Sequence, residues 1–140
     1  MNIDLINKKL DQIEVYLEEL EKLVFSHSQE EIKKDNALLY TAERLFQLLV
    51  DTMVDINIHI LISRDKIYDK TQSTFLLLEE MGILSKEFAK KIAQIVGLRN
   101  ILVHRYEILD KDLFVRHLFH NKDDFKRYVV AIYEFVNGII

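Results

Sequence analysis

No proline occurs in this chain of 140 residues, and glycine occurs only at Gly82, Gly97 and Gly138. Proline and glycine are the residues that most strongly disfavour helix interiors, so a chain nearly without them can form long helices. Its apolar residues recur at steps of three and four, whereas half-buried strands alternate apolar and polar residues. The sequence therefore predicts an all-α fold.

The clearest helical spacing lies near the N-terminus, where seven apolar residues form one stripe: Ile3, Ile6, Leu10, Ile13, Leu17, Leu20 and Val24. Such a stripe lets a helix pack along a bundle. Ser28 followed by Glu31 is a capping box, which predicts the start of a second helix. This helix would run to about Ile62, and it is apolar around most of its circumference. We therefore expect it to be buried at the centre of a bundle or in a subunit interface.

The second helix keeps one polar stripe at steps of four: Glu43, Gln47, Asp51, Asp55 and His59. A shorter helix is predicted from about Thr71 to Gly82, where glycine suits a left-handed cap. Ser85 is expected to cap the next helix, and Asn121 the last one. We expect an antiparallel bundle of four or five helices that forms one domain over residues 1–140.

Composition limits the classes of function. The chain has no cysteine, which excludes disulfides and thiolate metal sites. Its net charge of −4 argues against a general nucleic-acid scavenger. The charge is uneven, because residues 1–70 carry 9 Lys/Arg and 14 Asp/Glu, whereas residues 71–140 carry 10 and 9. Neither a secretory signal nor an apolar run of membrane-spanning length is evident, so we expect a cytoplasmic protein that does not enter a membrane.

The residues with the clearest chemistry lie in the sequence Arg-Asn-Ile-Leu-Val-His-Arg-Tyr at positions 99–106. Arg99, His104 and Tyr106 fit the pattern R-x4-H-x-Y. Arginine binds phosphate bidentately and is always charged, and histidine exchanges a proton near neutral pH. These two side chains suffice in principle for cleavage of RNA through attack by the 2′-hydroxyl, with no metal and no cofactor.

This pattern resembles the HEPN (higher eukaryotes and prokaryotes nucleotide-binding) superfamily, and within it the HepT-like toxins. The resemblance extends over roughly the last two-thirds of the chain and includes Val54–His59, Phe75–Gly82 and Phe88–Tyr106. It implies a homodimer in which two R-x4-H motifs face each other in a cleft, and an endoribonuclease that acts as the toxin of a toxin–antitoxin pair. It also implies an MntA-type nucleotidyltransferase antitoxin that transfers AMP to Tyr106. The RNA substrate, whether transfer RNA or messenger RNA, stays open.

Helix geometry leaves two alternatives for the motif. A step of five residues corresponds to about 500°, so Arg99 and His104 would lie about 140° apart on a continuous helix. Either the helix ends near Val103, or two subunits combine their motifs, as the resemblance implies. Gly97 permits a close backbone approach, which is compatible with a dimer.

Other residues are candidates for supporting roles. Asn100 could bind a phosphate oxygen or fix His104, and Asp55 is the predicted partner that orients Arg99. Four basic residues are candidates for binding flanking phosphates: Lys90, Lys91, Arg105 and Arg116. His117 and His120 fit a surface pair better than a metal site. The alternative function is a non-catalytic HEPN-type module that binds a nucleotide or a nucleotidyltransferase.

Overall fold

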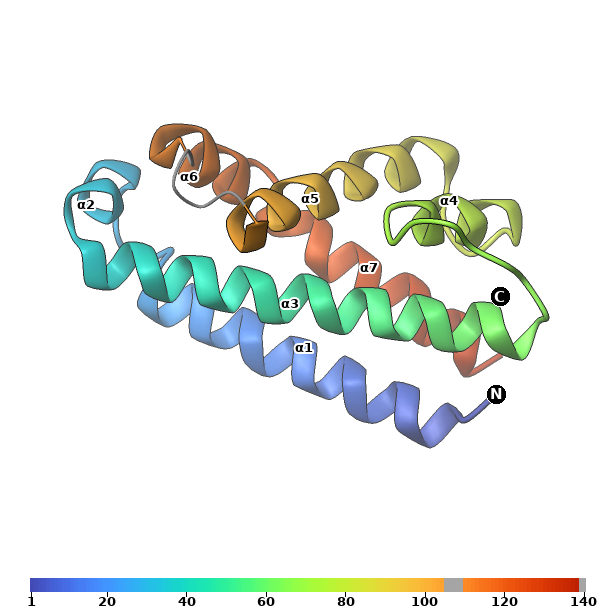
Figure 1. The fold of residues 1–140 in the computed structure, drawn as a ribbon. Coiled ribbons are helices and arrows are strands. Elements are labelled where there is room, and N and C mark those ends of the chain that lie inside the picture. The colour runs from blue at the N-terminus through green and yellow to red at the C-terminus, as the bar shows by residue number, and fades with distance from the viewer. Residues whose placement is uncertain (105–109, 139–140) are drawn as a thin grey trace.

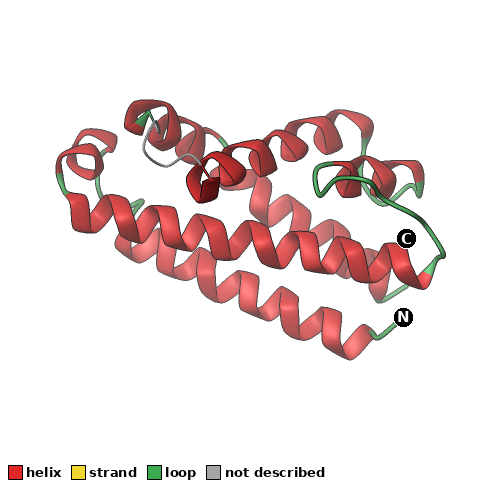
Figure 2. Ribbon diagram, viewed as in Figure 1, coloured by secondary structure: helices red, strands yellow, loops and turns green. Residues whose placement is uncertain are grey.

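The computed structural model describes residues 1–104 and 110–138, and over these residues it is a bundle of helices without strands (Figures 1 and 2). The helices are α1 (Ile3–Leu23), α2 (Gln29–Lys34), α3 (Asn36–Ser63), α4 (Ser73–Glu80), α5 (Lys86–His104), α6 (Lys111–His120) and α7 (Lys122–Val136). The predicted all-α fold is confirmed. Four of these helices are long, namely α1, α3, α5 and α7, and the three short ones lie between them.

Helix α3 lies at the centre of the bundle (Figure 1). It packs against α1, α2, α4 and α5, and α7 reaches it through buried side chains. Its buried residues face several directions, as the apolar circumference predicts, and they include Phe46, Leu49 and Ile60. Edge-to-face contacts join Phe46 to Phe114 of α6 and Phe125 of α7. The sequence left open whether this helix is central or lies in an interface, and the structure makes it central.

The prediction about membrane spans needs one correction. By length and composition alone, α3 is apolar enough to cross a membrane. However, 56% of its most apolar window is buried inside the protein. Its apolar surface is therefore explained by its central place in the bundle.

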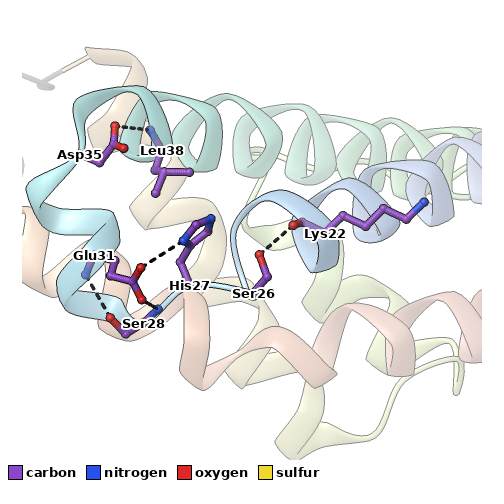
Figure 3. Close-up of polar contacts among 7 residues, drawn as sticks. All are labelled: Lys22, Ser26, His27, Ser28, Glu31, Asp35 and Leu38. Carbon is purple, nitrogen blue, oxygen red and sulfur yellow. Dashed lines mark hydrogen bonds and ion pairs between the residues drawn. The ribbon is translucent and has the colours of Figure 1, made fainter.

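The connection from α1 to α3 is built from side-chain caps (Figure 3). The Ser28 hydroxyl accepts a hydrogen bond from the Glu31 amide at 3.1 Å, and the Glu31 carboxylate accepts one from the Ser28 amide at 3.0 Å. The predicted capping box is confirmed. Asp35 then accepts bonds from the amides of Ala37 and Leu38 at 2.9 and 3.3 Å. This second cap divides the single helix predicted from Ser28 to about Ile62 into α2 and α3.

The other predicted helix ends are partly confirmed. Gly82 has a φ of +77°, and the Ser85 hydroxyl accepts from the Phe88 amide at 3.2 Å. Helix α6 was not predicted; Asp110 is its N-cap, and the carboxylate of Asp110 accepts from the Leu113 amide at 3.2 Å. Asn121 occupies the N-cap position of α7, as predicted, but its side chain makes no capping hydrogen bond there. Its side-chain amide instead donates at 2.8 Å to the carbonyl of His117 at the end of α6.

A buried polar cluster joins α3, α4 and α7. The Tyr128 hydroxyl lies 2.6 Å from Oδ1 of Asn57 and 2.9 Å from the carbonyl of Met53. Asn57 Nδ2 donates to the Thr74 hydroxyl at 3.1 Å. Burial raises the pKa of Tyr128 well above its usual value, so the phenol remains a neutral donor. The cluster satisfies polar groups that would otherwise be unpaired in the core.

We expect Tyr128→Phe to lower the free energy of unfolding by about 1–3 kcal/mol, because Oδ1 of Asn57 would lose its buried donor. Tyr133→Phe is the matched control, since Tyr133 lies on the same helix and is 51% exposed. The measurement is urea denaturation followed by circular dichroism. Equal midpoints for the two variants would show that the cluster contributes nothing to stability.

Candidate active site around Arg99

Arg99 lies at a pocket of about 380 Å³ between α3 and α5, here called the Arg99 pocket. Its apolar wall consists of Val50, Val54, Ile58 and Val96. Its polar lining consists of Asp51, Asp55, Thr71, Arg99 and Asn100. Arg99 is the only cationic residue among these lining residues. The pocket therefore combines one fixed guanidinium with carboxylates from the polar stripe of α3.

The carboxylate that holds Arg99 is Asp51. Arg99 Nε donates to Asp51 Oδ1 at 2.6 Å, and the two side chains are 24% and 46% exposed. Pairs exposed to this degree are screened by water and contribute about 1 kcal/mol or less to stability. The contact therefore matters mainly because it fixes the orientation of the guanidinium.

The predicted role of Asp55 was wrong. Asp55 lines the same pocket, but its carboxylate lies 3.7 Å from Lys9 of α1 and its side chain is 60% exposed. Asp51 and Asp55 are one turn apart on α3, a rise of about 6 Å along the axis. Arg99 contacts α3 at the turn that carries Asp51. Asp55, one turn further along, pairs with Lys9 of α1 instead.

Asn100 contacts Arg99 itself. Arg99 Nη1 donates to Asn100 Oδ1 at 3.2 Å. Arg99 Nη2 makes no hydrogen bond to any residue that the structure describes. Two of the three guanidinium nitrogens thus donate to described protein groups, and Nη2 is directed to none of them.

Helix α5 is described as far as His104, one position beyond Val103. On this continuous helix, the positions of Arg99 and His104 are about 140° apart around the axis. Arg105 and Tyr106, predicted for phosphate binding and modification, lie outside the described residues. Within this chain, the helix does not bring the positions of Arg99 and His104 to the same side.

The basic residues proposed for flanking phosphates differ in their surroundings. Lys91 Nζ lies 3.0 Å from the carboxylate of Asp124, which is almost fully buried. Arg116 Nη2 lies 3.6 Å from Asp112. Lys90 is exposed and has no ion pair among residues 1–104 and 110–138. Lys91 and Arg116 are therefore partly neutralised, and Lys90 is the one with its charge uncompensated by a described neighbour.

A separate ion pair ties α2 to α6. Lys33 Nζ donates to Asp112 at 2.9 Å, across 79 positions of sequence. Hydrogen bonding to Lys33 holds the pKa of Asp112 below its usual value, and so does the charge of Lys33. Together with the cap at Asp110, this pair fixes the start of α6, whose first residue, Lys111, follows Tyr106 by five positions.

Gly97 allows a close approach within the chain. The Nε2 atom of Gln72, which donates to the Ala93 carbonyl at 3.4 Å, lies 3.2 Å from the place that a Cβ on Gly97 would occupy. This is tighter than an ordinary contact. Glycine lets Gln72 pack across α5 just before Arg99. Among the described residues, no group of three His, Asp or Glu side chains could hold a metal ion.

Comparison with known proteins relates this arrangement to nucleases. The chain is 37% identical over 108 residues to the tRNA nuclease HepT of Aphanizomenon flos-aquae, which covers 76% of this chain and 72% of that protein. It is 26% identical over 132 residues to the mRNA nuclease HepT of Shewanella oneidensis, and this alignment covers 92% of this chain and 96% of that protein.

The fold is shared with a solved toxin complex. The structure of the tri-AMPylated Shewanella oneidensis HEPN toxin in complex with MNT antitoxin superposes with a TM-score of 0.84. That toxin is 27% identical, and the match covers 95% of this chain and 98% of that one. The family model for HepT-like ribonucleases matches residues 13–132. With the bundle, the Arg99 pocket and this match taken together, the chain belongs to the HepT-like ribonuclease family.

Proposed function

We propose that this protein is the toxin of a toxin–antitoxin pair, an endoribonuclease that cleaves RNA in the cytoplasm without a metal. The observation that carries the proposal is the Arg99 guanidinium, held by Asp51 in a pocket of a HepT-like chain. Asp51 holds the Nε edge of the guanidinium, so the Arg99 side chain is already oriented for a phosphate. The side chain therefore loses little conformational entropy when the phosphate binds.

Arg99 would stabilise the transition state. Attack of the 2′-oxygen on phosphorus gives a phosphorane with additional negative charge on its equatorial oxygens. A guanidinium with Nη2 available can donate to one of those oxygens, and the charge stabilises the phosphorane more than the diester. Asp51 acts as a positioning residue because it contacts only Arg99 in this scheme.

His104 would perform the proton transfers. One histidine takes the proton of the 2′-hydroxyl, the bond from the 2′-oxygen to phosphorus forms, and the bond from phosphorus to the 5′-oxygen breaks. A second histidine protonates the leaving 5′-oxygen, so the products are a 2′,3′-cyclic phosphate and a 5′-hydroxyl. Since Arg99 and His104 are about 140° apart on one helix, we propose a homodimer whose two motifs form one cleft.

The proposed substrate class is RNA, since one relative is a tRNA nuclease and another an mRNA nuclease. The proposed antitoxin is an MntA-type nucleotidyltransferase, since the solved relative is an AMPylated toxin in complex with an MNT antitoxin. In this reaction the Tyr106 hydroxyl loses its proton and attacks the α-phosphorus of ATP. Pyrophosphate leaves, and the tyrosine carries AMP.

The test is incubation of the purified protein with end-labelled RNA in excess EDTA, followed by end-group analysis. We expect cleavage with 2′,3′-cyclic phosphate ends, and growth arrest when the protein is expressed without the transferase. Intact RNA combined with saturable nucleotide binding would contradict the proposal and favour a non-catalytic module.

Asp51→Asn should lower the turnover number by about 10–100-fold, because the guanidinium loses the contact that orients it. The KM for RNA should stay the same or fall, since a negative charge leaves a phosphate-binding pocket. Asp51→Glu should restore part of the activity.

Asp55→Asn is the matched control, because it removes the same charge from the same pocket without touching Arg99. Its turnover number should change by no more than about twofold. Equal losses in the Asp51 and Asp55 variants would show that charge alone matters, and that the contact between Asp51 and Arg99 has no positioning role.

A further inference from the structure

A long groove runs along the seam between α1 and α7, away from the Arg99 pocket. Three cavities form it, and neighbouring ones share lining residues, so they are continuous from Asn7 to Phe25 of the N-terminal segment. That length corresponds to about 27 Å of helix. None of its lining residues lines the Arg99 pocket. We call this feature the acidic groove because carboxylates outnumber lysines among its lining residues.

The groove has an apolar floor and charged rims. Leu17 and Val129 line its floor, and Val130 and Tyr133 are 55% and 51% exposed there. Its rims hold six carboxylates and two lysines. The carboxylates are Asp11, Glu14, Glu18, Glu21, Asp123 and Glu134, and the lysines are Lys122 and Lys126. The net charge of the groove residues is therefore −4, as large as the net charge of the whole chain.

This combination selects the kind of occupant. Surplus carboxylates repel the RNA backbone, so the groove is unsuited to the substrate. A two-fold contact between two copies of this groove would bring together a net charge of −4 from each copy, which disfavours self-association. An apolar floor about five helical turns long between acidic rims is complementary to a helix with one apolar stripe and basic flanks.

We propose that the acidic groove binds a cationic amphipathic helix of a protein partner. The apolar stripe of that helix would cover Leu17, Val130 and Tyr133, and its lysines or arginines would pair with the carboxylates of α1. Lys122 lines the cavity at the Phe25 end, Lys126 lines this cavity and the central one, and no lysine lines the cavity at the Asn7 end. The basic side chains of the partner would therefore gather toward the Asn7 end. Because the groove and the Arg99 pocket share no residue, binding leaves the pocket uncovered.

The experiment uses the full-length protein and a fluorescein-labelled peptide of about 18 residues, in which leucines form one helical stripe and lysines fill the other positions. Fluorescence anisotropy should give saturable binding with one peptide per chain. Glu14→Lys combined with Glu18→Lys should weaken binding at least roughly tenfold. A peptide of the same composition, scrambled so that no stripe exists, should bind at least roughly tenfold more weakly than the first peptide.

The matched control is Glu19→Lys combined with Glu80→Lys, which makes the same change in charge at two exposed residues outside the groove. Its peptide affinity should stay within about threefold of the parent, because neither residue lines the groove and exposed surface charges are screened at physiological salt. All four positions are exposed, so both double variants should retain the parent circular dichroism spectrum. Arg99→Ala should bind the peptide as the parent does, so failure of the proposed function would not affect this result.

Four outcomes would overturn the proposal: absence of saturable binding, equal weakening by the groove and control variants, photocross-linking of RNA to residues of the groove, or a dimer in light scattering that only the groove variant dissociates. The last would identify a second copy as the occupant. The third would identify a nucleic acid.

Discussion

Alanine in place of Arg99 is expected to lower the rate of RNA cleavage by roughly 10³-fold or more. The substitution removes the one cation among the described residues that line the Arg99 pocket. It also leaves Asp51 without its 2.6 Å partner, so an uncompensated carboxylate would face the incoming phosphate. The measurement is the single-turnover rate with labelled RNA in EDTA, with circular dichroism to show that the bundle is intact.

Two further variants separate these effects. Combining Arg99→Ala with Asp51→Asn should recover part of the RNA affinity, because the repelling carboxylate is gone, but none of the cleavage. Arg99→Lys should retain part of the activity, because lysine keeps the charge but lacks the planar geometry that meets Asp51 and phosphate together. Full activity of Arg99→Ala would refute the assignment of the site.

His104→Ala should lower the same rate by about 10²–10⁴-fold, as expected for loss of a general acid or base. Its RNA affinity should change little, which distinguishes it from Arg99→Ala. The helical content should be unchanged, because alanine has the highest helix propensity of the amino acids. Cleavage by His104→Ala at the parent rate would exclude this histidine from the proton transfers.

Local signals in the sequence predicted much of the fold. The capping box at Ser28 and the left-handed glycine at Gly82 depend on a few neighbouring residues, and both were found where expected. Asp35 is also of a residue type that caps helices. However, the apolar spacing continues past Asp35, so the sequence did not indicate the break between α2 and α3 that this cap makes. The bond from Asn121 to the carbonyl of His117 depends on α6, a helix too short to show a strong periodic signal.

The site was predicted as a set of residues but not as a set of contacts. The polar stripe of α3 contains both Asp51 and Asp55, which share one face of the helix. Only the height at which α5 crosses α3 decides which of them meets Arg99, and that height is set by packing throughout the bundle. The acidic groove was missed for a similar reason. The carboxylates of α1 look like a solvated face until α7 is known to lie beside them.

Transfer of AMP to Tyr106 is expected to abolish RNA cleavage, with a loss comparable to that of Arg99→Ala, about 10³-fold. Tyr106 follows Arg99 by seven positions and His104 by two. An AMP group there would bring a bulky phosphodiester with its own negative charge next to the residues that bind the substrate phosphate. Such a group would both occupy the cleft and repel RNA. The measurement is cleavage before and after incubation with the cognate transferase and ATP, with mass spectrometry to locate the added AMP.

Tyr106→Phe provides the decisive control, because it removes only the hydroxyl that accepts AMP. This variant should cleave RNA at close to the parent rate and should stay active after treatment with transferase and ATP. Inactivation of Tyr106→Phe by that treatment, or AMP mapped to another residue, would refute the assignment. If Tyr106→Phe is inactive before treatment, the phenol itself takes part in cleavage. Transfer of AMP would then inactivate the protein by removing the free hydroxyl, and bulk and charge in the cleft would not be needed.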